Sequence, residues 1–102
     1  MATASTDNPL ERVIEAKVVE YAKSLEFRQR KMNGAGFRGW PDRIFHKDGR
    51  TFYIEFKRKG GRLSPGQGMV IRDLRAAKIA VYVIDNVEDG KKVIDEYQRK
   101  SS

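Results

Sequence analysis

Hydrophobic residues near the start of the chain recur every three or four positions, from Leu10 to Leu25. This spacing places them on one face of an α-helix and leaves charged residues on the other face. Asp7-Asn8-Pro9 precedes the pattern, and an Asn cap followed by Pro at the first helical position is a helix start signal. The pattern therefore predicts an amphipathic helix that ends at about Leu25.

Segments rich in β-forming residues follow this helix and are separated by turn residues. Phe27–Met32 alternates weakly between apolar and polar residues and predicts a first strand, which a glycine-rich loop at residues 33–39 then ends. Pro41–Lys47 and Arg50–Arg58 flank the dipeptide Asp48-Gly49. Because Asp-Gly between two β-rich segments is a strong hairpin signal, these residues predict a β-hairpin.

The second half of the chain predicts a helix, a strand and a closing helix. Ser64, the proline after it and Gln67 form a capping box, so a helix should begin there and continue to about Ala77. Ile79–Ile84 is nearly continuous in apolar residues, which is typical of a strand covered on both faces. Val87–Gln98 has the hydrophobic spacing of a final helix.

These elements predict a single α/β domain in which helices flank a four-stranded sheet. The sheet is mixed, with both antiparallel and parallel pairs, as in α+β folds. The 102 residues are enough for one hydrophobic core and not for two. Short hairpins make the first three strands antiparallel, and the helical crossover makes the fourth strand parallel to the third. We interpret residues 1–8 as a flexible lead, 9–98 as the domain and 99–102 as a tail.

The hairpin turn determines which residues of the two strands face each other. With Asp48-Gly49 as the turn, opposed residues have numbers that add up to 97. Asp42 is then opposite Glu55, with the two Cβ atoms roughly 5 Å apart, and Lys57 projects from the same face. The other face carries apolar side chains suited to a core: Phe45, Phe52, Ile54 and Phe56.

Two facing carboxylates repel each other unless something offsets their charge. The alternatives are a shared proton, an ion pair with Lys57, or a divalent cation. Carboxylate oxygens, a backbone carbonyl and water molecules are the ligands that suit Mg²⁺. The chain has one His and no Cys, so a zinc site built from softer ligands is not expected. A divalent cation with an ammonium beside it would form a site for phosphoryl transfer.

The distribution of charge favours a phosphate-rich partner. The formal net charge is +7, and the segment from Phe27 to Leu63 holds eleven Lys and Arg residues against three acids. Such a basic segment suits nucleic acid, while a solvated surface is the alternative interpretation. The sequence has no cysteine, no signal-peptide pattern and no apolar segment of membrane-spanning length, so we expect a cytoplasmic protein without a membrane partner.

Four pieces of sequence, taken in order, resemble the VRR-NUC family of the PD-(D/E)XK nuclease superfamily. They are Gly39-Trp40-Pro41-Asp42, Glu55-Phe56-Lys57, the segment from Gly60 to Gln67, and Val81–Asp85. The similarity extends from about Pro9 to Gln98. It implies a restriction-endonuclease-like αβββαβ core, and the chain resembles stand-alone members from bacteriophages and bacteria that act on Holliday junctions.

The resemblance also implies roles for individual residues. In such nucleases the Asp and Glu of these motifs bind the metal, here Asp42 and Glu55. The backbone carbonyl between Glu and Lys, here that of Phe56, commonly adds a ligand. The Lys, here Lys57, orients or activates the attacking water. The implied metal is Mg²⁺, for which Mn²⁺ should substitute.

Further residues follow from the same resemblance. A Glu of the first helix usually joins the catalytic and metal site; Glu15 fits best, Glu11 and Glu20 compete, and an ordinary solvated Glu15 is the alternative. Gln67 is often near the site in this family, although its capping role alone also explains it. For Trp40 the alternative to stacking on a base or deoxyribose is packing, and His46 is expected to be a surface or DNA-contact residue rather than a catalyst. The expected DNA contacts are Arg38, Trp40, Arg43, His46, Arg58, Lys59, Gly60, Gly61 and Arg62.

The function implied by the resemblance is a Mg²⁺-dependent, structure-selective DNA endonuclease that leaves 5′-phosphate and 3′-hydroxyl ends. The expected substrate is branched DNA, above all the four-way (Holliday) junction, cut by a homodimer without a small-molecule cofactor. One alternative is a nucleic-acid-binding module that keeps the nuclease scaffold and is inactive alone. Another is a subunit that cuts flap or other branched DNA only with a partner.

Overall fold

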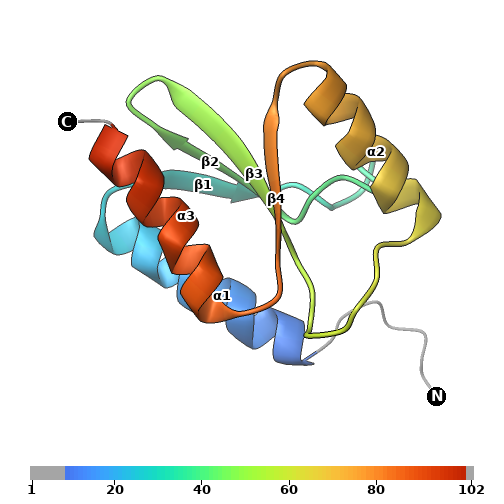
Figure 1. Ribbon diagram of the computed structural model, residues 1–102, viewed down its shortest axis with the longest axis horizontal. Coiled ribbons are helices and arrows are strands. Elements are labelled where there is room, and N and C mark those ends of the chain that lie inside the picture. Colours follow the sequence, from blue (N-terminus) through green and yellow to red (C-terminus); the bar gives the residue numbers. More distant parts are fainter. Residues whose placement is uncertain (1–8, 101–102) are drawn as a thin grey trace.

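The computed structural model of the chain describes residues 9–100 (Figure 1). Its three helices and four strands follow the predicted order. They are α1 (Pro9–Ser24), β1 (Arg28–Lys31), β2 (Arg43–Lys47), β3 (Arg50–Phe56), α2 (Pro65–Ala76), β4 (Ala80–Ile84) and α3 (Val87–Lys100). The predicted lead at residues 1–8 lies outside the described residues, as do residues 101–102 of the predicted tail, whereas α3 extends to Lys100.

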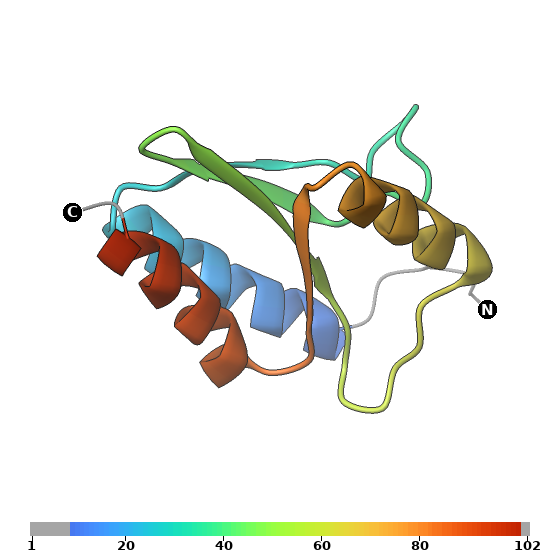
Figure 2. The same ribbon diagram turned by 45° about the horizontal axis from the view of Figure 1, so that its top comes forward.

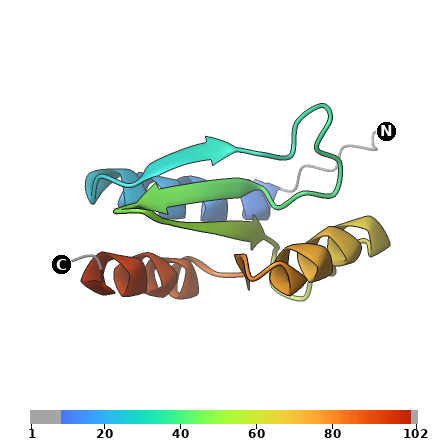
Figure 3. The same ribbon diagram turned by 90° about the horizontal axis from the view of Figure 1, so that it is seen from above.

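The four strands form one sheet in the order β1-β2-β3-β4. The pairs β1–β2 and β2–β3 are antiparallel and β3–β4 is parallel, which confirms the predicted topology. Helices α1 and α3 lie side by side against one face of the sheet, and α2 lies at the opposite face (Figures 2 and 3). Within residues 9–100, no helix combines the length and apolar character needed to cross a membrane.

The hairpin turn has the backbone conformation that the Asp-Gly signal requires. Asp48 has φ 50° and Gly49 has φ 82°, so both central residues are left-handed, as in a type I′ turn. The pairs from Arg43 opposite Ile54 to Lys47 opposite Arg50 confirm the predicted register. The turn therefore determines which side chains of β2 and β3 share a face.

The main core lies between the sheet and the helices α1 and α3. Phe45, Phe52 and Ile54 are fully buried there, together with Val18 of α1 and Ile94 of α3. Phe45 and Phe52 stack with ring centroids 5.2 Å apart, in the offset arrangement that aromatic pairs favour. These side chains occupy the face that the register predicts to be apolar.

The opposite face of the sheet is covered only in part. A second cluster there joins Tyr53 and Val81 of the sheet to Ile71 of α2. The prediction that β4 is covered on both faces is wrong at Val83, which is 41% exposed. The reason is that β4 is an edge strand, and α2 packs over Val81 without reaching Val83. Because Val83 is paired with Glu55, this uncovered part of the sheet adjoins the acidic pair.

The contact between α1 and α3 depends on a glycine. A Cβ atom at Gly90 would lie 2.5 Å from Cγ2 of Val18, which is fully buried and stiff about χ1. We predict that Gly90→Ala lowers the free energy of unfolding by about 1–3 kcal/mol, despite the better helix propensity of Ala.

Gly68→Ala is the matched control for chemical denaturation. Gly68 is also helical, but a Cβ there would meet no atom within 4 Å. This variant should gain about 0.5–1 kcal/mol from helix propensity. Equal stability of the two variants would contradict close packing of α3 against α1.

Candidate active site

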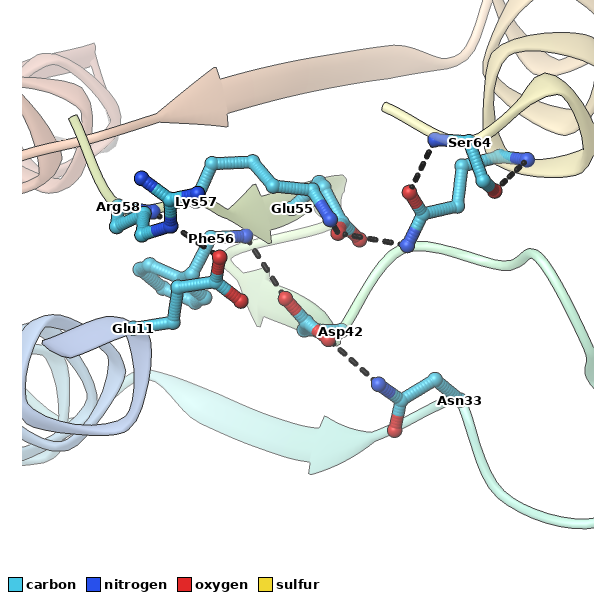
Figure 4. A network of polar contacts seen from close by, with 9 residues as sticks. Glu11, Asn33, Asp42, Glu55, Phe56, Lys57, Arg58 and Ser64 are labelled. Carbon is cyan, nitrogen blue, oxygen red and sulfur yellow. Dashed lines mark hydrogen bonds and ion pairs between the residues drawn. The ribbon is translucent and has the colours of Figure 1, made fainter. Parts of the chain in front are cut away.

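The ends of β2 and β3 bring Asp42 and Glu55 together (Figure 4). Asp42 directly precedes β2, and its carbonyl accepts a hydrogen bond from the Met32 backbone at 2.8 Å, which extends the pairing with β1. Its carboxylate reaches toward β3, where Oδ2 accepts a hydrogen bond from the backbone N–H of Phe56 at 2.8 Å. The Asp42 side chain therefore connects the strand ends next to Glu55.

Glu55 is a buried carboxylate with one unsatisfied oxygen. The residue is 1% exposed, and its Oε2 lies 3.1 Å from Gln67 Nε2 and 3.3 Å from Lys57 Nζ. Oε1 is buried and has no hydrogen-bond partner among the described residues. Since an unpaired buried charged oxygen is costly, Oε1 marks the position at which an external cation or donor would stabilise the structure.

Gln67 links the start of α2 to this carboxylate. Its Oε1 accepts a hydrogen bond from the Ser64 backbone at 2.9 Å, and its own backbone donates to Ser64 Oγ at 3.1 Å, which completes the predicted capping box. The remaining amide group, Nε2, donates to Glu55. Capping and contact with the acidic pair are therefore two functions of one side chain.

Asn33 makes the corresponding contact with Asp42, and sequence reasoning missed it. Its Nδ2 donates to Asp42 Oδ1 at 2.5 Å (Figure 4). Asn33 follows β1 in the glycine-rich loop, and continuing the β1–β2 register places Met32 opposite Asp42 and Asn33 one residue further. No short turn or periodic pattern in the sequence fixes this loop position, so the sequence carried no signal for the contact. Asn33 is thus a candidate positioning residue, a neutral donor that orients a carboxylate without cancelling its charge.

Burial raises the pKa values of both carboxyl groups. The pKa of Asp42 rises to about 6, mainly by desolvation, with the hydrogen bond from Phe56 opposing the shift. The pKa of Glu55 rises to about 7, first by desolvation and then by the charge of Asp42, while Lys57 opposes the shift. Near neutral pH the pair therefore resists full ionisation, as expected of like charges held together away from water.

Glu15 lies near the pair but is engaged in ion pairs. Its charge contributes to the raised pKa of Asp42. The residue is 9% exposed, and its Oε2 lies 2.6 Å from Arg43 Nε and 3.6 Å from Lys31 Nζ. Arg43, expected to contact DNA, also donates to Gln29 and so is bound within the protein. Across residues 9–100 no three His, Cys, Asp or Glu side chains form a ready metal cluster, so Glu15 as a ligand stays a prediction.

The two competing acids of α1 differ in position. Glu11 is half-buried, and its Oε2 accepts a hydrogen bond from the Arg58 backbone at 3.2 Å, just beyond Lys57 (Figure 4). Glu20 is exposed on the same helix. The structure therefore brings Glu11 to the end of β3 and leaves Glu20 exposed.

The other expected DNA contacts lie mainly on two loops. Residues 58–62 belong to the segment between β3 and α2, in which the basic side chains are exposed, and Arg38 is exposed on the glycine-rich loop. Trp40 is half-buried and packs on Tyr53 at a centroid distance of 5.9 Å. His46 is exposed near the hairpin turn, where its Nδ1 lies 2.8 Å from Thr51 Oγ1.

The residues of the pair suit a hard divalent cation. The donors are carboxylate oxygens, the ligands that Mg²⁺ prefers, and the sequence has no cysteine to favour a softer metal. The unpartnered Oε1 of Glu55 gives such a cation a buried anionic oxygen. A positive ion would also favour the ionised forms of both carboxyl groups, whose pKa values are raised mainly by burial and further by neighbouring negative charges.

Comparison with known proteins defines the fold. No family model matches the sequence, and no curated protein matches it. A solved structure described as "VRR_NUC domain" has a TM-score of 0.77 and 22% sequence identity, and covers 88% of this chain and 99% of its own. The chain therefore has the fold of a VRR_NUC domain, as the sequence motifs predicted.

The raised pKa values predict how the stability of the metal-free protein depends on pH. Because the folded pKa values, about 6 and about 7, exceed the ordinary values of 3.8 and 4.5, the folded state binds protons more tightly than the unfolded state. The free energy of unfolding should therefore fall as the pH rises from about 4 through about 7. Denaturation in EDTA over this range measures the effect.

Glu55→Gln is the comparison, because its amide does not ionise. As the pH rises from about 4 to about 7, the free energy of unfolding of wild type should fall relative to that of Glu55→Gln by on the order of 2 kcal/mol. Parallel stability curves for the two proteins would contradict a strained carboxyl pair.

Proposed function

We propose that this chain is a metal-dependent endodeoxyribonuclease that hydrolyses phosphodiester bonds with Mg²⁺. One observation carries the proposal: in the Asp42–Glu55 pair the buried Oε1 of Glu55 has no partner among the described residues, and Lys57 Nζ lies 3.3 Å from the other oxygen of Glu55, Oε2. The nuclease-like VRR_NUC fold supports the same conclusion. Both carboxyl groups are held by protein donors, which is the preorganisation that a catalytic metal site needs.

The metal ligands proposed are Asp42, Glu55, the carbonyl of Phe56 and a carboxylate from α1, for which Glu15 is the first candidate. A bound Mg²⁺ would stabilise the charge that develops on the phosphate and leaving oxygens, and Mn²⁺ should replace it. Gln67 and Asn33 keep the two carboxylates in place through their amide hydrogen bonds. The protein thus orients the acidic oxygens before any substrate arrives.

Lys57 supplies a positive charge at the same site. Its side chain is 14% exposed, so the ammonium lies close to the protein surface without being fully solvated. From there it can donate a hydrogen bond to the attacking water or to a phosphate oxygen and stabilise the charged transition state. Because Lys57 follows Glu55 by two residues in the strand direction, the hairpin positions both.

Basic loops would attract the DNA backbone to this site. Arg58, Lys59 and Arg62 are exposed directly after β3, and the whole chain has a formal net charge of +7. Contacts of Lys and Arg with phosphates position DNA without reading its sequence. We therefore propose selectivity for DNA structure rather than for base sequence.

The finer proposal is incision of four-way junctions by a homodimer in the cytoplasm of a bacterium or phage-infected host. A two-fold dimer would place one active site on each of two opposed strands. The competing proposal is a binding module that is inactive alone, or one that acts on flap DNA with a partner. The acidic pair and Lys57 favour the active enzyme over the binding module.

The test is cleavage of four-way, flap and linear DNA with Mg²⁺ or Mn²⁺ under single-turnover conditions. Asp42→Asn and Lys57→Ala should each lower the cleavage rate by about 100-fold or more, because they remove a metal ligand and the catalytic charge. Glu20→Gln, which changes an exposed acid of α1, is the charge-matched control and should cut at the wild-type rate.

Several outcomes separate the parts of this proposal. A wild-type protein that binds DNA but never cuts it with either metal would overturn the enzyme. Full activity of Glu15→Gln would remove only the role of that residue and direct attention to Glu11. Light scattering of the protein and its junction complex tests paired incision, and a monomer in both samples would contradict the dimer.

A further inference from the structure

A groove opens beside the acidic pair, between the glycine-rich loop and the start of α2. Its volume is about 1110 Å³, and its walls include Trp40 on one side and Met69 and Val70 on the other. Gly39 keeps the two sides together: its φ is +84°, and a Cβ there would lie 3.2 Å from the carbonyl oxygen of Gly66. Met69 is 56% exposed, so an apolar wall of this groove faces solvent.

The groove leads directly to the proposed active site. Asn33 and Gln67 both line it, and each donates a side-chain hydrogen bond to one carboxylate of the pair. A ligand seated in the groove therefore lies next to the two amides that hold Asp42 and Glu55. This continuity makes the groove a place for the part of a substrate that adjoins the reacting phosphate.

A glycine on the helical wall of the groove is required neither by its backbone conformation nor by close packing around it. Gly66 shares one face of α2 with Met69, Val70 and Asp73, because residues three, four and seven positions apart align on a helix. Its φ is not positive, and a Cβ on it would meet no atom within 4 Å. Glycine in a helix is unfavourable. What Gly66 provides is room in the groove, so that a ligand can approach the backbone closely.

The opposite wall repeats this feature. Gly34 lines the groove, lacks a positive φ and would also meet no atom within 4 Å as alanine. Gly34 and Gly66 therefore lie on opposite walls of one groove. Neither backbone conformation nor internal packing explains a glycine at either position. Together they indicate a flat ligand that contacts main chain on both sides.

The lining chemistry suits a nucleobase. Apolar walls suit the faces of a heterocycle, and the flexible thioether of Met69 adapts to different bases. Polar groups suit its edges, and Asp73 would repel a phosphate placed inside. Arg38, which also lines the groove and is exposed, suits the phosphate that remains outside.

We propose that this groove binds an unpaired nucleotide of the DNA strand, next to the phosphate at the acidic pair. The proposal rests on the nuclease proposed above and, among the branched substrates named there, favours flap DNA, because the bases of a four-way junction are all paired. A paired base is held in the duplex stack, so it can enter a groove only after it leaves the helix. The protein should therefore prefer DNA with unpaired bases at a branch to continuous duplex.

The test measures binding to labelled DNA in EDTA, so that no cleavage takes place. The probes are a duplex with a short unpaired branch, the same DNA with abasic branch residues, and the fully paired duplex. Wild-type protein should bind the branch with bases about tenfold more tightly than the abasic branch, the gain expected from stacking one base. Gly66→Ala should remove this preference, because its methyl group occupies the groove.

Gly68→Ala is the matched control, since Gly68 is also helical, also meets no atom within 4 Å and does not line the groove. Both variants should unfold at a higher temperature than wild type, because Ala favours the helix. Gly68→Ala should keep the wild-type preference for bases. A lower unfolding temperature for Gly66→Ala would show that the fold itself needs this glycine and would overturn the proposal.

Equal affinity of wild type for the base-containing and abasic branches would also overturn the nucleotide site, even if the protein cuts DNA with Mg²⁺. A retained preference in Gly66→Ala would do the same. Conversely, a base preference in a protein that never cuts would leave this site standing and overturn the nuclease. The two proposals therefore fail in different ways.

Discussion

The structure depends on one constraint: two carboxylates lie close together in a largely buried place, and one of their oxygens lacks a partner. The backbone N–H of Phe56 holds Asp42 at 2.8 Å, and Gln67 and Lys57 hold only one oxygen of Glu55. Burial raises both pKa values, and a neighbouring negative charge adds to each: that of Glu15 for Asp42 and that of Asp42 for Glu55. A fold selected only for stability would avoid such a pair, because unsatisfied buried charge costs more than surface charge. The pair is explained if a cation completes it.

The elements around this pair combine local folding signals with the geometry of the site. The type I′ turn at Asp48-Gly49 fixes the register that brings the acids together. The capping box begins α2 and also delivers the Gln67 amide to Glu55. Gly39 lets the preceding loop approach α2 closely, which forms the groove beside the acids. Residues that shape the backbone thus also shape the site.

Much of this arrangement was predictable because it follows from short-range rules. The side-chain period of a strand and the turn type gave the register, and a capping motif gave the start of α2. Features that depend on tertiary packing were not accessible in the same way. The exposure of Val83 reflects how far α2 extends over the sheet, and the ion pair between Glu15 and Arg43 joins residues of two elements. Asn33 was missed because loop side chains follow no periodic pattern.

The central claim is that the acidic pair is a divalent-cation site, and calorimetric titration of Mg²⁺ into the protein tests it most directly. At about pH 6.5 the pair should hold close to one proton, since its pKa values are about 6 and about 7, and binding should release about one proton per metal. At about pH 9 release should be near zero. Titration in buffers of different ionisation enthalpy measures this number. Absence of Mg²⁺ binding at both pH values, or equal proton release in Glu55→Gln, would contradict the account.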